Sequence, residues 1–279
     1  MKQQAHREPV ARVTPARQGR SSRRPVIVPP QHGAWAFLGL PILLGFAASG
    51  FTWLTLVLAA GFVLAYPTSY FAIAVLRYPR PELYRRGLVT WGLPAIAIAI
   101  VVLIARPWMV WIGLAYAIGF AINLGFAKAR NERSLINDAV FIIECVAITP
   151  VIWACTESTG GVVPPSPVSA PSALWALTAM GGLALIGSTL HVRSLIRERR
   201  NESFRRASQV FAIASLLAAI VLAVPYGGGA VASAICAFGY LTARAFFVGR
   251  RPLRPGIIGV FELVGFITVF GVGVVICAS

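Results

Sequence analysis

The sequence predicts an all-α membrane protein, a polytopic bundle of transmembrane helices. Hydrophobic residues make up 57% of the 279 residues and charged residues only 12%, whereas a soluble domain averages about 45–50% and about 25%. The mean hydropathy is +0.76. The apolar residues form long runs that short arginine-rich segments separate. A soluble globular fold of this size could not bury so much apolar surface, and such a chain is too apolar to be disordered except at its ends.

The first 30 residues differ from the rest. Residues 1–30 are polar and basic and show no helical or strand periodicity. We expect a disordered cytoplasmic tail that lies near anionic lipid headgroups. Residues 31–279 form the predicted transmembrane domain.

Spanning helices need about 20 apolar residues each, and this length divides the domain into nine segments. The uncharged stretch from Gly33 to Leu76 is too long for one span, and Gly50 is a plausible turn within it. A second short break falls at Arg106 and Pro107. The predicted spans are residues 33–50, 52–76, 88–105, 107–127, 134–155, 173–192, 207–224, 229–248 and 256–277.

The basic residues set the orientation of these nine spans. With the N-terminus inside, 24 of the 25 lysines and arginines fall in the tail or in inside segments, and only Arg106 lies outside. The positive-inside rule requires this asymmetry. We therefore predict a cytoplasmic N-terminus and an external C-terminus. The inside segments after the tail are residues 77–87, 128–133, 193–206 and 244–255.

Acidic residues inside apolar spans are costly in a bilayer and are candidates for function. Glu144 lies near the middle of the fifth span, and no cation is within two turns of it, so we expect it to be protonated or paired with another helix. Asp138 could pair with Arg130 or Arg133 near its helix N-terminus, or serve a function. Glu262 could be reached by Arg244 or Arg254. A proton- or ion-coupled mechanism would use Glu144 and Glu262.

The fourth span carries small residues at four-residue spacing. Ala115, Gly119, Asn123 and Ala127 form a stripe suited to close helix contact. Asn123 is a candidate interhelical hydrogen-bond donor.

Three polar clusters should meet at the cytoplasmic side. They start at Gln31, Lys128 and His191. Arginines four residues apart suit a phosphate or diphosphate, because a guanidinium binds such groups through two parallel hydrogen bonds. The candidate ligand-binding residues are Lys128, Arg130, Asn131, Asn137, Arg193 and Arg197. The candidate acid–base residues are Asp138, Glu132, Glu198, His191 and His32.

The same clusters carry a family resemblance. The segments QHGAWAFLGLPILLGF, KARNERSLIND and HVRSLIRERRN resemble the YwiC-like family of bacterial membrane proteins, from about residue 30 to the end. The resemblance implies a multi-pass protein of the bacterial cytoplasmic membrane whose biochemical role is not established.

The predicted architecture is also similar, more distantly, to the UbiA-type membrane prenyltransferases. That resemblance implies two Asp-rich cytoplasmic motifs that hold Mg²⁺ and a prenyl diphosphate. Here the loop after the second span has no Asp, and the loop after the sixth has only Glu198 and Glu202. Mg²⁺ is expected only under this resemblance, since no other cofactor or metal motif is evident.

Three functions remain open at this point. The first is an enzyme or binder for an anionic amphipathic ligand, such as an isoprenoid diphosphate or a phospholipid, at the cytoplasmic face. The second is a proton- or ion-coupled transporter, and the third is a non-catalytic membrane assembly protein. The expected partners are the bilayer and its anionic lipids, with no nucleic acid. Whether the protein is an enzyme, and its oligomeric state, stay open.

Overall fold

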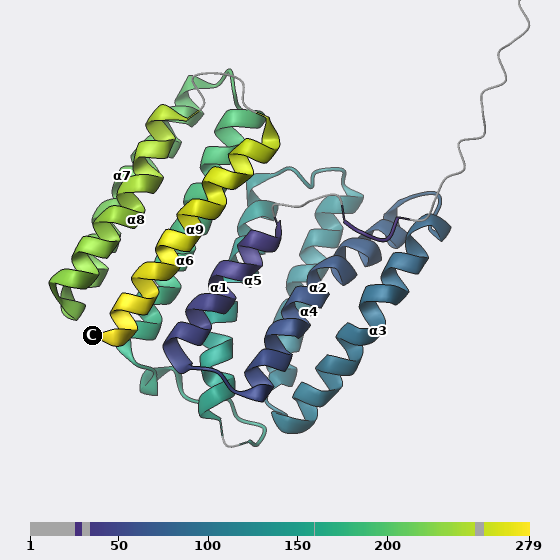
Figure 1. Ribbon diagram of the computed structural model, residues 1–279. Helices are drawn as coiled ribbons and strands as arrows, with labels where there is room; N and C mark the ends of the chain where they lie inside the picture. The colour runs from purple at the N-terminus through teal and green to yellow at the C-terminus, as the bar shows by residue number, and fades with distance from the viewer. Residues whose placement is uncertain (1–25, 30–33, 159, 249–253) are drawn as a thin grey trace, which may run out of the picture.

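The computed structural model describes residues 26–29, 34–158, 160–248 and 254–279 (Figure 1). All regular structure in these ranges is helical, as predicted. This part of the chain forms nine α-helices: α1 (Ala34–Ser49), α2 (Trp53–Arg77), α3 (Glu82–Ala105), α4 (Met109–Lys128), α5 (Leu135–Glu157), α6 (Ser172–Ile196), α7 (Glu202–Ala223), α8 (Gly227–Phe247) and α9 (Pro255–Ala278).

These helices coincide with the nine predicted apolar segments, and each runs antiparallel to the one before it (Figure 1). The turn predicted at Gly50 is present, with a φ of 74° that glycine adopts without strain. Several helices extend further than predicted. The third begins at Glu82 rather than residue 88, and the seventh begins at Glu202, where the Asn201 side chain caps the backbone N–H of Phe204. The reason is that capping and polar first turns continue a helix beyond its apolar run.

Length decides which of the described helices can cross a bilayer. Seven helical stretches are long and apolar enough, and one of them is the 46-residue run Glu202–Phe247. That run is a hairpin, because the chain reverses at the short turn Val224–Tyr226 and at Gly227, whose φ is 87° (Figure 1). By contrast, α1 has 16 residues, or about 24 Å, which is less than the roughly 30 Å of a hydrocarbon core. The helices are those of a multi-pass membrane protein, while the count of nine spans remains a prediction.

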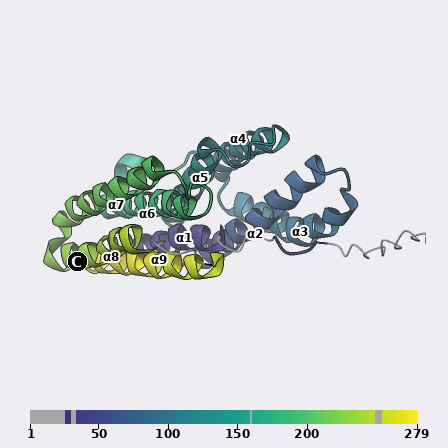
Figure 2. The same ribbon diagram turned by 90° about the horizontal axis from the view of Figure 1, so that it is seen from above.

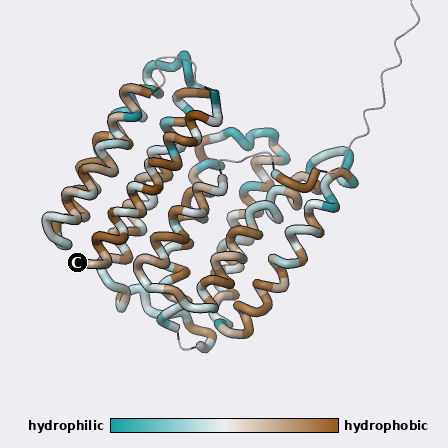
Figure 3. The backbone as a smooth tube through the Cα atoms, viewed as in Figure 1, coloured by the Kyte–Doolittle hydropathy of each residue, from teal (hydrophilic) through white to brown (hydrophobic). Residues whose placement is uncertain are grey.

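Hydropathy distinguishes the two ends of the bundle, because the most hydrophilic residues gather at one of them (Figure 3). We call the end where α2, α4, α6 and α8 finish the arginine-rich end. Most of the predicted tail lies outside the described residues, and so does His32. Of the tail, Val26 and Ile27 contact α3 through two hydrogen bonds. The Val26 N–H donates to the Leu83 carbonyl, and Trp91 Nε1 donates to the Ile27 carbonyl.

The helices form two layers, as the view down the bundle shows (Figure 2). One layer contains α4, α5, α6 and α7 side by side, and the other contains α3, α2, α1, α9 and α8. The short helix α1 lies at the centre, against α5, α6 and α9. Polar side chains that face the space between the layers are therefore shielded from lipid.

The contact between α1 and α5 joins the two layers. Leu44 and Ile152 are fully buried in it. A hydroxyl bond adds to the packing, since Thr149 Oγ1 donates to the Pro41 carbonyl at 3.0 Å. Gly45 lets the two helices approach closely, because a Cβ at this position would lie 2.9 Å from Ile152 Cβ.

We therefore expect Gly45→Ala to destabilise the bundle by about 1–3 kcal/mol, the usual effect of overpacking. The matched control is Gly39→Ala in the same helix, where an added Cβ meets no atom within 4 Å. Thermal unfolding in detergent measures both. Equal melting temperatures for the two variants would show that the layers are not packed as described.

Candidate functional site

The first polar cluster lies at the arginine-rich end, between α5 and α6. Arg193 Nη1 is 3.0 Å from Asp138 Oδ2, and Arg197 Nη1 is 3.9 Å from the same oxygen. Arg193 Nε is also 4.0 Å from Glu198 Oε1. We call these four residues the Asp138 cluster. The predicted partners Arg130 and Arg133 make no ion pair with Asp138 in the described part of the chain, and the arginines come from α6 instead.

Local structure explains this difference. Ser134 caps α5 by accepting from the Asn137 N–H, so Asp138 lies in the first turn. Arg130, in contrast, sits in the turn before α5 with a φ of 56°. That turn is closed by the Asn137 side chain, whose Nδ2 donates to the Glu132 carbonyl.

The remaining predicted residues of this end do not join the Asp138 cluster through any ion pair among the described residues. Glu132 pairs with Arg77 at the end of α2. Lys128, Arg130 and Asn131 are exposed. The structure thus keeps the two arginines together at Asp138, while Lys128, Arg130 and Asn131 take no part in this cluster.

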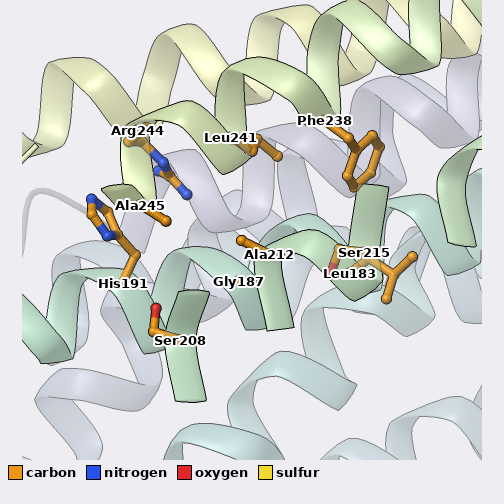
Figure 4. A pocket seen from close by; sticks show the side chains of 10 residues that line it. All are labelled: Leu183, Gly187, His191, Ser208, Ala212, Ser215, Phe238, Leu241, Arg244 and Ala245. Carbon is orange, nitrogen blue, oxygen red and sulfur yellow. The ribbon is translucent and has the colours of Figure 1, made fainter. Parts of the chain in front are cut away.

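The second polar cluster is buried between the layers, within about two turns of the arginine-rich end. Arg244 of α8 and Glu262 of α9 form an ion pair, and their residues are only 4% and 5% exposed. Of the two predicted partners for Glu262, the structure selects Arg244. His191 of α6 is 2% exposed. It faces Arg244 (Figure 4), whereas Glu198, seven residues later and beyond the end of α6, stays near the surface.

Hydroxyl groups that the sequence analysis missed surround this pair. Ser188 lies beside Glu262, and Ser208 and Ser215 of α7 line the same cavity as His191. Ser208 and Ser215 are seven residues apart in an apolar helix, so they share a face. That seven-residue spacing was the signal in the sequence from which the two serines could have been found.

The third polar site is Glu144, near the middle of α5. Asn123 Nδ2 of α4 donates to Glu144 Oε2 at 3.3 Å, which confirms both the expected pairing with another helix and the interhelical role of Asn123. Tyr116 Oη donates to the Glu144 backbone carbonyl at 2.6 Å. The side chain also occupies the space above Gly119, where a Cβ would collide with it. Glu144 makes no ion pair with any described residue. It lies on α5, whereas Glu262 lies on α9.

The donor set at the arginine-rich end does not suit Mg²⁺. The three predicted acid–base carboxylates, Asp138, Glu132 and Glu198, each have an arginine neighbour. Over the described ranges, no three His, Cys, Asp or Glu side chains gather in a way that could hold a metal ion. Mg²⁺ needs several oxygen ligands free of such competition.

Residues 28–153 match the family model described as "YwiC-like protein". The predicted resemblance to the YwiC-like family is confirmed. The family match includes Asp138 and Glu144 and ends before α6.

Two curated relatives extend the likeness. "Uncharacterized protein YwiC" of Bacillus subtilis (strain 168) is 28% identical over 239 residues, which is 85% of this chain and 92% of the relative. An "Uncharacterized protein" of Haemophilus influenzae (strain ATCC 51907 / DSM 11121 / KW20 / Rd) is 27% identical over 199 residues, 71% of this chain and 78% of the relative. No solved structure matches the chain.

The Asp138 cluster should couple α5 to α6 energetically. The Arg193 side chain is 14% exposed and keeps only the more distant Glu198 when Asp138 is removed, so we expect Asp138→Ala to cost about 1–3 kcal/mol. The double variant Asp138→Ala, Arg193→Ala should lose less than the sum of the single variants, by about 1 kcal/mol or more. Unfolding of the protein in mixed micelles by sodium dodecyl sulfate gives these energies.

The control for this cycle is Glu202→Ala, whose partners Arg205 and Arg206 are exposed. Its effect should stay below about 1 kcal/mol. Strictly additive losses at Asp138 and Arg193 would mean that the pair does not join the helices.

Proposed function

We propose that this protein binds an anionic amphipathic ligand, such as an isoprenoid diphosphate or a phospholipid, at its arginine-rich end. We place that end in the cytoplasm and the bundle in the bacterial cytoplasmic membrane, because the positive-inside rule favours this orientation. The observation that carries the proposal is a surface hollow that holds two arginines, next to an exposed apolar stripe on the helix that follows it.

The hollow lies at the turn between α6 and α7. Its lining residues are Arg197, Glu198, Arg200, Asn201, Glu202 and Ser203, so two arginines and two glutamates face it. The Arg197 side chain is 43% exposed although it neighbours Asp138, so it can still donate to a ligand. The segment from residue 193 to residue 206 holds six arginines and two glutamates, and this excess of positive charge favours a phosphate or diphosphate head.

The apolar stripe follows α7 away from the hollow. Val210, Ile213, Leu217 and Val221 are exposed, and their spacing of three or four residues puts them on one helix face. An acyl or prenyl chain can lie along this stripe while its head stays in the hollow. The turn between α6 and α7 thereby binds the head of the ligand, and α7 binds its tail.

The carboxylates favour binding over chemistry in this proposal. Asp138, Glu132 and Glu198 neighbour arginines, so their first role is to position guanidinium groups. We therefore propose a binder, and we assign no metal-assisted prenyl transfer to this end.

The test is the lipid that stays with the detergent-purified protein. We expect native mass spectrometry to find an anionic amphiphile on the wild type, and the double variant Arg197→Ala, Arg200→Ala to retain at least about tenfold less. Two charge-assisted hydrogen bonds at about 1.5–3 kcal/mol each justify that factor. The charge-matched control is the double variant Arg85→Ala, Arg86→Ala, which removes two exposed arginines of α3 at the same end of the bundle. Equal retention by the Arg197→Ala, Arg200→Ala variant and the control would refute the site.

A second function, proton- or ion-coupled transport, is favoured by the environment of Glu144. Its carboxyl lies near the middle of a spanning helix with Asn123 as its polar partner. Intramembrane carboxyls without a cation are typical of proton-exchange sites.

If Glu144 exchanges protons, a pH jump should produce a carboxyl band in the infrared difference spectrum that is absent in Glu144→Gln. Glutamine keeps the size of the side chain and its contact with Asn123. Glu157→Gln, an exposed acid at the end of the same helix, should leave the band in place. A wild-type spectrum without any such band would remove Glu144 from a coupling role.

A further inference from the structure

Helix α4 is packed loosely against the bundle, and two of its hydrogen bonds to α5 end on one residue. It lies at the edge of its layer and packs mainly against α5 (Figure 2), and three of its 20 residues are buried. Tyr116 Oη donates to the Glu144 backbone carbonyl at 2.6 Å, and Asn123 Nδ2 donates to Glu144 Oε2 at 3.3 Å. The state of Glu144 therefore affects how firmly α4 is held.

Hydrogen-bond acceptors outnumber donors where Glu144 meets Asn123. An ionised carboxylate only accepts, and Asn123 Nδ2 is the donor that the structure gives it. Asn123 Oδ1 is buried and has no hydrogen-bond partner among the described residues, although buried acceptors are almost always satisfied. Tyr116 does not correct the imbalance, because its O–H is directed at the Glu144 carbonyl. One proton on the carboxyl supplies the missing donor.

A protonated carboxyl and a primary amide are complementary, since each then offers a donor and an acceptor. The acid O–H donates to Asn123 Oδ1 while Glu144 Oε2 goes on accepting from Nδ2, which closes a ring of two hydrogen bonds. The rotation of the carboxyl that this ring needs is about a soft terminal torsion. The ring contains no net charge, whereas an ionised Glu144 places a charge with one neutral donor between apolar helices, which is costly.

We propose that a proton on Glu144 holds α4 against α5 and that loss of this proton releases the helix. In the docked state, the protonated carboxyl and Asn123 form the two-bond ring. When the proton leaves to water, the carboxylate needs solvation, and α4 moves outward so that water reaches it. Acidic pH thus favours the docked state and alkaline pH the released state. This role depends on the proton exchange proposed above for Glu144 and adds the helix that responds to it.

Gly119 fits α4 to this role. The Glu144 side chain occupies the space that a Cβ at Gly119 would fill. Gly119 and Asn123 are four residues apart, so α4 presents a bare turn and then an amide on the face that meets Glu144. Docking therefore encloses the carboxyl between the two helices, and separation of the helices exposes it.

The other ionisable groups around this contact do not supply a charge to Glu144. Its ionisable neighbours are Tyr116 of α4 and Cys145 of its own helix, and both types are neutral at about pH 7. The helix α1, which also packs against α5, has no ionisable residue. The remaining ionisable residues of the helices packed against α4 or α5 are Tyr66, Tyr70 and Arg77 of α2, Glu82, Tyr84, Arg85 and Arg86 of α3, Lys128 of α4, and His191 and Arg193 of α6. The charged ones among them lie in the turns nearest the arginine-rich end, and Asp138 of α5 is paired with Arg193 there.

The test measures the distance between α4 and α6 in the full chain by pulsed electron paramagnetic resonance in lipid nanodiscs. Spin labels are attached at the exposed positions Ile118→Cys of α4 and Ile186→Cys of α6, with the exposed native thiols removed by Cys236→Ser and Cys277→Ser. We expect one distance at acidic pH. At alkaline pH a second population should appear at a distance longer by about 3 Å or more, the width of the water molecule that enters.

Variants with the same labels separate the proton from general loosening. Glu144→Gln should keep the docked distance at every pH, because its amide forms the same two-bond ring with Asn123 and does not titrate. Glu157→Gln, an exposed acid at the end of the same helix, should behave like the wild type. A control label pair, Ile186→Cys with Ile267→Cys of α9, lies on helices that pack against each other and should show one distance throughout.

Each contrary result has a defined meaning. A wild-type distance that does not change with pH overturns the release of α4, and a carboxyl band in the infrared difference spectrum would then leave Glu144 exchanging its proton without moving the helix. Absence of both the band and the distance change removes the coupling role as well. A longer distance that persists in Glu144→Gln at alkaline pH assigns the movement to another group.

Discussion

An ionised side chain between two apolar helical layers needs an opposite charge beside it, and this requirement organises the polar groups of this bundle. Arg244 and Glu262 meet it in the interior, and Asp138 meets it with arginines of α6 nearer the surface. Each pair joins helices that pack against each other. Packing supplies the attraction between helices, while the pairs restrict how the helices can slide relative to each other.

Much of the architecture was predictable because the bilayer imposes one simple rule on length. Runs of apolar residues and the glycine at position 50 were enough to locate the nine α-helices of the described ranges. Their ends were less predictable, since the N-cap at Asn201 and the acidic first turn at Glu202 continue α7 into a segment that composition assigns to a loop. The layers themselves could not be derived, because lipid-facing and buried residues are equally apolar in such helices.

The candidate sites were likewise predictable only in part. Acidic residues in apolar runs identified Asp138, Glu144 and Glu262 as important, since a carboxyl at those depths is costly unless it has a polar partner or a function. Their partners depend on which helices are neighbours. Arg193 is 55 residues from Asp138 in the chain, and His191 could face either Glu198 or Arg244 until the rotation of α6 was known. Sequence spacing describes one helix at a time and contains no information about the helix opposite.

The unusual position of Arg106 has a consequence for how the chain enters the membrane. Among the residues that the structure describes, it is the one basic residue at the end opposite the arginine-rich one, and its Nε and Nη1 donate to the carbonyls of Cys155 and Ala105. In the proposed orientation, the α3–α4 connection is the only external connection in the described part of the chain that contains a basic residue. Its positive charge must cross the membrane during synthesis. An inside-negative potential opposes this by about 2.3 kcal/mol per charge at 100 mV, and the two carbonyls hold the arginine once it has crossed. The connection between α5 and α6 has no lysine or arginine at all. Helices α3 to α6 can therefore insert as two hairpins, α3–α4 and α5–α6. Only one cation, Arg106, then moves outward against the membrane potential.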